Sequence, residues 1–401
     1  MEIFVSYLLA GSAILIAVPI AHLFIEVFSA VVLPRREEPL NAGHDHRHSV
    51  AVLVPAHNES IGLCPTLDDI KSQLQPGDRA IVVADNCTDD TAAVAASKRI
   101  EVVERHDLGR IGKGYALEFG LGHLGLNPPD IVVIIDADCR LADGTIDRLA
   151  LMCAQTGRPV QALDLMVAPS RDQPGLHGVA EFAWRLKNWI RPLGLSKLGL
   201  PCQLMGTGMA FPWSVLRSAE LASGLLVEDL KLGLDLAMAG KPALFCPTAV
   251  VTSTFPTSSS GSDAQRKRWE QGHLSMIVTS ALPLVAKGLF QGNFGLVALA
   301  LDMAIPPLSL LAMFVCGICL TGGLAAMFGF SSIAFTIGLG SLLAFSFAIV
   351  LSWLGFGREV LPARAILSTF HYFLGKLRIY HELLSGRTVG RWTRTDRNNF
   401  D

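Results

Sequence analysis

Long apolar runs near both ends of the chain place the strongest limits on its fold. From Phe4 to Leu33 the only ionisable residues are His22 and Glu26. A helix rises about 1.5 Å per residue, so about 20 such residues cross a hydrocarbon core of roughly 30 Å. A cleaved signal peptide has a short apolar run that follows Lys or Arg, whereas this run is long and no Lys or Arg precedes it. We therefore predict a transmembrane helix over residues 1–33.

Two further apolar runs lie towards the C-terminus, at Phe294–Phe328 and Ser331–Phe356. They predict two more transmembrane helices joined by a short outside loop. Asp302 and the Pro306-Pro307 pair make the first of them irregular. A carboxylate inside a membrane helix is usually functional, but one near the end of a span can also reach water, and both interpretations of Asp302 stay open.

Basic residues predict which side of the membrane each segment faces. Arg35 and Arg36 follow the first apolar run, and eight arginines and lysines crowd the tail, residues 357–401. The positive-inside rule then places the middle segment and the tail in the cytoplasm and the N-terminus outside. Leu274–Phe290 and Leu361–Leu384 mix apolar and basic residues, so we expect helices that lie in the membrane interface.

Composition agrees with a membrane protein that carries one sizeable domain. The chain has 401 residues, of which 51% are hydrophobic and only 17% charged, and its mean hydropathy is +0.43. This leaves room for one domain of about 200 to 250 residues besides the spans. A net charge of -2 gives no basic face for nucleic acid. We expect no nucleic-acid partner.

The middle segment alternates short apolar runs with helical patterns, which predicts an α/β domain with a mostly parallel sheet. The expected strands are Val50–Pro55, Ala80–Ala84 and Ile131–Ile135, and the expected helices are Thr66–Leu74, Thr91–Lys98 and Tyr115–Leu124. Ligands of such sheets bind at the carboxyl ends of the strands. Polar clusters follow each expected strand, at residues 57–59, 85–86 and 136–138.

Asp136 and Asp138 form the cluster best suited to a divalent metal. Alternate carboxylates at the end of a strand can bind Mg or Mn on a sugar diphosphate, where the ion stabilises the departing diphosphate. The alternative is an acidic turn in which Asp138 caps the following helix.

Glu228 and Asp229 form a second acidic pair. Asp229 is the candidate general base that takes the proton of an acceptor hydroxyl, and Glu228 would orient it. The alternative is a carboxylate that only stabilises the start of a helix.

Gln265, Arg268 and Trp269 follow at i, i+3 and i+4, so they share one helix face. Arg268 suits a diphosphate and Trp269 suits stacking on an acceptor sugar. A helix on a membrane surface would also show such residues without a catalytic role.

Glycine-rich stretches supply two further candidates and one rejected motif. Lys113 lies in a Gly-rich loop and could reach a nucleotide, although loop lysines are often only solvated. Gly206-Thr207-Gly208 lets the backbone approach an acceptor sugar, unless it is an ordinary turn. Residues 120–125 match G-x-G-x-x-G but lie in a helical pattern before a strand. A dinucleotide site would need the reverse order, so NAD is not implied.

Taken in order, these motifs resemble the membrane-bound glycosyltransferase family 2. The segments that carry the resemblance are residues 55–59, 84–91, 113–117, 136–138, 228–229 and 265–269. The resemblance implies a Rossmann-like GT-A fold and inverting transfer from a UDP-sugar with Mg or Mn. It also implies nucleotide-sugar contacts at Glu59, Asp85, Lys113, Asp136, Gln265 and Arg268, with Asp85 on the uracil. Glu59 and Asp85 could otherwise cap the helices that follow them.

The resemblance extends to the branch with cellulose, chitin and hyaluronan synthases, and it implies a bacterial inner (plasma) membrane. We predict transfer to a lipid-linked or saccharide acceptor in surface or exopolysaccharide synthesis, with other polysaccharide-assembly proteins as further partners. A processive polysaccharide synthase is the alternative, and a nucleotide-binding membrane protein without activity is a more distant one. The expected divisions are 1–33, 34–48 (linker), 49–257 (catalytic), 258–290 (interfacial), 291–356 (two spans) and 357–401 (tail).

Overall fold

The computed structural model describes residues 2–34, 48–169, 175–222, 227–256 and 259–365. Its contacts divide the chain into two compact units. The helical unit comprises residues 1–35, 170–199 and 273–388, and the α/β unit comprises residues 36–169, 200–272 and 389–401. Most of the predicted linker and of the predicted tail lies outside the described residues.

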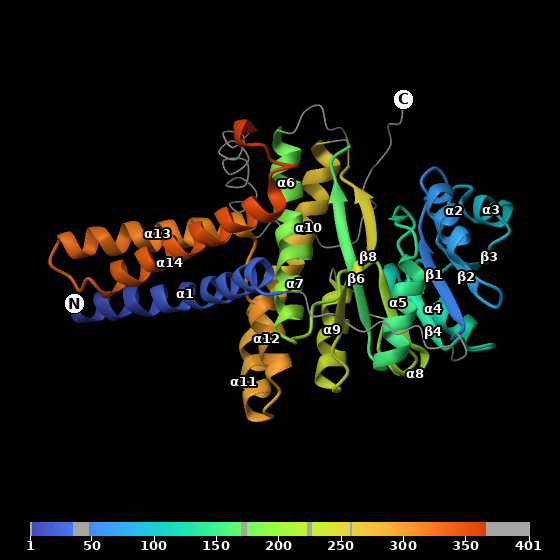
Figure 1. Cartoon of the computed structure of the whole chain (residues 1–401), viewed down its shortest axis with the longest axis horizontal. Helices are drawn as coiled ribbons and strands as arrows, with labels where there is room; N and C mark the ends of the chain where they lie inside the picture. The colour runs from blue at the N-terminus through green and yellow to red at the C-terminus, as the bar shows by residue number, and fades with distance from the viewer. Residues whose placement is uncertain (1, 35–47, 170–174, 223–226, 257–258, 366–401) are drawn as a thin grey trace. The chain divides into compact units, whose positions relative to one another are not determined.

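The α/β unit is built on an eight-stranded mixed sheet in the order β3-β2-β1-β4-β7-β6-β8-β5 (Figure 1). Its strands are β1 (Val50–Ala56), β2 (Arg79–Asp85), β3 (Glu101–Arg105), β4 (Ile131–Ile134), β5 (Arg140–Leu141), β6 (Val160–Val167), β7 (Met209–Pro212) and β8 (Leu244–Thr254). The first four form a parallel block, and β7 joins it in antiparallel pairing with β4. The predicted Rossmann-like fold class is confirmed, with three of its strands within two residues of the expected bounds.

Seven helices accompany the sheet among the described residues. They are α2 (Leu63–Gln73), α3 (Thr91–Ser97), α4 (Lys113–Leu124), α5 (Thr145–Thr156), α8 (Trp213–Leu216), α9 (Glu228–Met238) and α10 (Ser259–Met276). Apolar residues of α2 and α5, such as Leu67 and Leu149, are fully buried in one core cluster with residues of β1 such as Val52. Gly120 lets α4 approach the other face, since a Cβ there would lie 2.5 Å from Leu53 Cδ1. The G-x-G-x-x-G sequence lies in α4 and at its C-cap, as expected.

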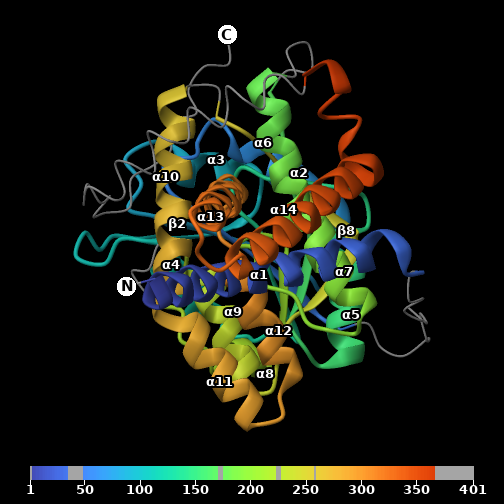
Figure 2. The ribbon, with the colours of Figure 1, turned by 90° about the vertical axis from the view of Figure 1, so that its left-hand side faces the viewer.

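In the helical unit, the long helices α1, α13 and α14 lie side by side, whereas α6–α7 and α11–α12 run across them (Figures 1 and 2). The bounds are α1 (Glu2–Val32), α6 (Gly175–Arg185), α7 (Arg191–Lys197), α11 (Leu282–Phe290), α12 (Phe294–Met303), α13 (Leu308–Met327) and α14 (Ile333–Ser352). Single π-helical turns join α6 to α7 and α10 to α11, at Leu186–Ile190 and Ile277–Ala281.

Four helical runs in the described part of the chain are long and apolar enough to cross a membrane, where the sequence predicted three. They are Glu2–Val32, Lys267–Phe290, Leu308–Met327 and Ile333–Gly357. The sequence placed most of the second run in the interface. The expected span Phe294–Phe328 is two helices, because Pro306 and Pro307 supply no backbone N–H and end the helical ladder.

Residues 170–199 lie between β6 and β7 in the sequence, yet they pack within the helical unit, which the sequence did not indicate. Buried Arg191 of α7 donates to Glu26 of α1 at 3.1 Å and to Asp302 of α12 at 2.5 Å. Lys197 donates to the carbonyl of Ala30 near the end of α1. Asp302 is only 6% exposed, so it does not reach out to water, and its partner is Arg191.

Candidate active site

The two aspartates of the predicted metal site follow β4 at the carboxyl end of the parallel block. Asp136 and Asp138 are both half-buried. The Asp136 N–H donates to Thr207 Oγ1 at 3.0 Å, which fixes the turn. Helix α5 begins after Gly144 without a side-chain cap, so the alternative of Asp138 as its cap is wrong.

Two carboxylates are enough for a magnesium or manganese ion that brings ligands of its own. Among the described residues no group of three or more His, Cys, Asp and Glu could hold a metal ion. Mg²⁺ commonly takes one or two protein carboxylates and completes its shell with phosphate oxygens and water. The donor set therefore suits an ion that arrives with a diphosphate.

Lys113, the first residue of α4, points into this edge of the sheet. Its Nζ donates to the Asp136 carboxylate and, at 2.8 Å, to the carbonyl oxygen of Gly206. Its side chain is 19% exposed, so the alternative of a solvated loop lysine is wrong. Burial lowers the pKa of Lys113, but the charges of Asp136 and Glu228 outweigh it and raise the pKa above its usual value.

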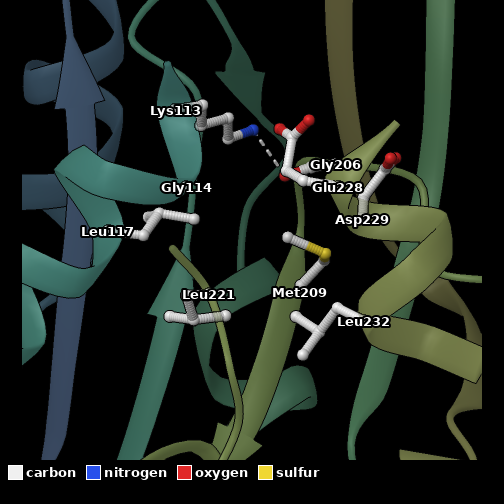
Figure 3. A pocket seen from close by; sticks show the side chains of 9 residues that line it. All are labelled: Lys113, Gly114, Leu117, Gly206, Met209, Leu221, Glu228, Asp229 and Leu232. Atoms are coloured by element: carbon white, nitrogen blue, oxygen red, sulfur yellow. Dashed lines mark hydrogen bonds between the residues drawn. The ribbon is translucent and has the colours of Figure 1, made fainter. Parts of the chain in front are cut away.

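Glu228 and Asp229 begin α9 and face the same space as Lys113 (Figure 3). Burial and the adjacent Asp229 charge raise the pKa of Glu228 to about 7, although Lys113 opposes the shift. Gly206, at φ +93°, allows this approach, because a Cβ there would lie 3.3 Å from Asp229 Oδ2. Two carboxylates and one ammonium group thus share a small volume, which suits proton transfer near neutral pH.

The pocket that these groups line spans about 290 Å³, with the open solvent at its mouth included, and has an apolar floor, visible in Figure 3. The floor is made by Leu117, Met209, Leu221 and Leu232, which come from α4, β7, the segment after α8, and α9. The sequence analysis missed these residues. No local signal distinguishes them from the core, because only the tertiary fold brings the four segments together.

The predicted nucleotide-binding residues lie at the ends of β1 and β2. Asp85 is 5% exposed, and its Oδ1 accepts from Arg105 at 2.6 Å. The Glu59 N–H donates to Thr91 Oγ1 at 2.8 Å. Helices α2 and α3 have Gly62 and Asp90 at their cap positions, so neither predicted residue caps them. Arg105, which the sequence analysis missed, fixes one side of the Asp85 carboxylate.

The Gly206-Thr207-Gly208 segment packs against the residues of the site and forms hydrogen bonds with them. Thr207 is 5% exposed and receives the Asp136 N–H, while Gln161 donates to the Thr207 carbonyl at 2.8 Å. Gly208, at φ +65°, packs so closely that a Cβ would lie 2.7 Å from Ala162 Cβ. These contacts explain why two glycines are needed here, and the predicted contact with an acceptor stays a prediction.

Helix α10 brings its motif towards the acidic pair within the α/β unit. The charge of Glu228 acts on the guanidinium of Arg268. Arg268 and Trp269 are half-buried, whereas the side chain of Gln265 lies outside the described part of the structure. Arg268 is therefore the member of this motif whose charge interacts with a residue that lines the pocket.

Comparison with known proteins supplies the class. The model of the family described as "Glycosyltransferase like family 2" matches residues 46–272, and the chain belongs to this family. This confirms the family, the fold class and the glycosyltransferase enzyme class predicted from the sequence. The match does not confirm the predicted branch with cellulose, chitin and hyaluronan synthases.

The chain is also similar to uncharacterized glycosyltransferases of Mycobacterium tuberculosis and Mycobacterium bovis. Each is 33% identical over 146 residues, which cover 35% of this chain and 60% of the relative. The chain thus matches about 60% of the length of these relatives.

Among solved structures, a mannosyltransferase of Pyrobaculum calidifontis in complex with GDP-Man and Mn²⁺ has a TM-score of 0.56 and 19% identity. It covers 95% of this chain and 100% of its own. A glucosyl-3-phosphoglycerate synthase of Mycobacterium tuberculosis, crystallised with Mn²⁺ and UDP, has a TM-score of 0.39 and 20% identity. It covers 59% of this chain and 84% of its own.

Proposed function

We propose that this protein transfers a sugar, with inversion, from a UDP-sugar to a membrane-associated acceptor. The observation that carries the proposal is the pocket around Lys113. Lys113 Nζ contacts the Asp136 carboxylate at the end of β4, and the two carboxylates of α9 line the same pocket as Lys113. An inverting transfer needs a metal-diphosphate site and a base within one space, and this arrangement provides candidates for both.

Asp136 and Asp138 would hold Mg²⁺ or Mn²⁺, which supplies Lewis acidity to the departing diphosphate when it is bound. Lys113 and Arg268 are the cations of this chain that would bind the remaining charge on the diphosphate. The metal in the Pyrobaculum mannosyltransferase supports the proposal, because that protein shares the fold.

Asp229 would take the proton of the acceptor hydroxyl as the sugar is transferred. Glu228, whose pKa lies at about 7, would share the pocket in its protonated form at lower pH and so keep a second negative charge from building up beside the base. Because the hydroxyl attacks from the face opposite the leaving diphosphate, inversion needs no covalent intermediate.

The nucleobase of the sugar donor is the part of the proposal for which there is a specific alternative. UDP is expected from the resemblance of the residues around Asp85, whereas the Pyrobaculum mannosyltransferase holds GDP-Man. Asp85 Oδ1 accepts from both Arg105 and Asn86. Uracil or guanine would have to be recognised although Asp85 Oδ1 already accepts these two hydrogen bonds. The UDP-sugar and GDP-mannose must therefore be compared directly.

A membrane-associated acceptor is supported by the arrangement of the helical unit. Helices α1, α13 and α14 run in one direction, and α11–α12 cross it (Figure 1). We propose that the first three span the bilayer and that the second pair lies in the interface, as the sequence predicted for Leu274–Phe290. With three spans the basic tail would be cytoplasmic, in agreement with the positive-inside rule. So few spans favour addition of single sugars over processive synthesis.

The test is nucleotide release by the purified full-length protein. Protein in mixed micelles with a bacterial lipid extract and Mn²⁺ is incubated with UDP-sugars and, in parallel, with GDP-mannose. We expect lipid-dependent release of UDP from at least one UDP-sugar. Release of GDP alone would show that the donor is GDP-mannose and not a UDP-sugar. No release of nucleotide from any donor with any lipid would favour a nucleotide-binding protein without transferase activity.

A further inference from the structure

Lys113 contacts Asp136, one of the two candidate metal ligands. Its Nζ contacts the Asp136 carboxylate and the Gly206 carbonyl oxygen. Lys113 stands at the start of α4, and its hydrogen bond to the Gly206 carbonyl oxygen, at 2.8 Å, holds its ammonium group in place (Figure 3). The metal-free protein thus carries its own cation at one of its two candidate metal ligands.

A divalent cation without a nucleotide would therefore meet an unfavourable site. To use Asp136 it must displace the ammonium group or sit beside it, and like charges at such a distance repel strongly. Lys113 Nζ also donates to the Gly206 carbonyl oxygen at 2.8 Å, and Glu228 and Asp229 line the same pocket, so the ammonium group has other partners near Asp136 even if it leaves that carboxylate.

A metal that arrives with a diphosphate is repelled less by Lys113. The phosphate oxygens can accept from Lys113 Nζ as it leaves Asp136, and their negative charge offsets the repulsion between the two cations. Each ligand then favours the other, and because coupling between binding sites is reciprocal, the same factor applies to both.

We propose that Lys113 makes metal binding depend on the nucleotide. It pairs with Asp136 in the metal-free protein, opposes binding of the metal alone, and transfers to the diphosphate when the two bind together. This inference rests on the proposed function for the diphosphate step, but its first half concerns the protein and the metal only.

The test measures Mn²⁺ affinity of the full-length protein in detergent by electron paramagnetic resonance of free Mn²⁺, with and without UDP. The variant is Lys113→Met, with Lys113→Gln as a second variant should the first fail to fold. Lys98→Met is the matched control. It also removes one lysine from an ion pair, at 2.7 Å from Asp68, on the surface of the same unit.

Without UDP, we expect Lys113→Met to bind Mn²⁺ at least about ten-fold more tightly than the wild type, because a nearby positive charge is removed. UDP should tighten Mn²⁺ binding clearly in the wild type and in Lys98→Met, and much less in Lys113→Met. Unchanged or weaker Mn²⁺ binding by Lys113→Met without UDP would overturn the inference. Failure of UDP to bind the wild type in the presence of Mn²⁺ would instead contradict the proposed function.

Discussion

Individual carboxylates in the pocket differ in their surroundings, and these differences separate their roles. Asp136 is paired with Lys113, whereas Glu228 is raised to a pKa of about 7 by burial and by the charge of Asp229. The sequence could assign a base to the pair from its composition alone. It could not show which member carries the shifted pKa, because the shift depends on residues from other parts of the chain.

The base assignment predicts a loss confined to the chemical step. Asp229→Asn keeps the size and removes the proton acceptor, so kcat should fall by about 100-fold or more while UDP affinity stays near the wild-type value. Steady-state kinetics and UDP titration measure the two quantities. Asp235→Asn, on the same helix, is the control. Loss of UDP binding by Asp229→Asn would make Asp229 a nucleotide or folding residue.

Glu228 predicts a pH-dependent change in stability. Its pKa rises from 4.5 to about 7 on folding, so the folded protein binds the proton more tightly and this group costs stability as pH rises between those values. Glu228→Gln removes the cost. Its Tm should match the wild type near pH 4.5, exceed it increasingly up to about pH 7, and keep that advantage above. A Tm difference that is the same at every pH would contradict the assignment.

At the scale of elements, local patterns found β1, β2, β4 and the helices that follow them, because alternation and apolar runs depend on neighbouring residues. The break after Met303 was foreseen only as an irregularity. The docking of residues 170–199 within the helical unit was not foreseen at all. It depends on Arg191 meeting two carboxylates more than 100 residues away, and no local pattern reports such a contact.

We expect substitutions of two neighbouring residues of α10 to cause different defects. Arg268→Ala removes a cation near Glu228 and should weaken both UDP-sugar binding and transfer. Trp269→Ala removes a stacking face without a charge, so it should impair transfer to the acceptor more than donor binding. UDP titration and transfer rates distinguish the two. Equal loss of nucleotide affinity in both, or normal transfer by Trp269→Ala, would place the acceptor site elsewhere.

The contacts of α7 predict a stability effect without a role in chemistry. Arg191→Met leaves Glu26 and Asp302 buried without their cation, which should cost about 3–5 kcal/mol. Arg140→Met, which breaks an exposed pair with Asp69, should cost about 0–1 kcal/mol. Thermal unfolding in detergent measures both. Similar Tm values for the two variants would show that the buried cluster does not hold α7 in place.

For the molecule as a whole, we propose a metal-dependent membrane glycosyltransferase that combines a GT-A domain with apolar helices. Composition and apolar runs were enough to predict a membrane protein with one domain in the middle of the chain. They did not predict the number of candidate spans, because Lys267–Phe290 is apolar enough to cross a membrane. Only the crosswise position of α11, its last part, within the helical unit argues against a span.

The central claim is that Asp136 and Asp138 hold the metal through which the nucleotide-sugar is used. The most direct measurement is transfer of labelled sugar from a UDP-sugar into extractable lipid by the wild type and by Asp138→Asn, with Mn²⁺ or with chelator. We predict transfer by the wild type only with metal, and near-complete loss in Asp138→Asn together with weaker metal-dependent UDP binding. Full transfer by Asp138→Asn in the presence of chelator would contradict the account.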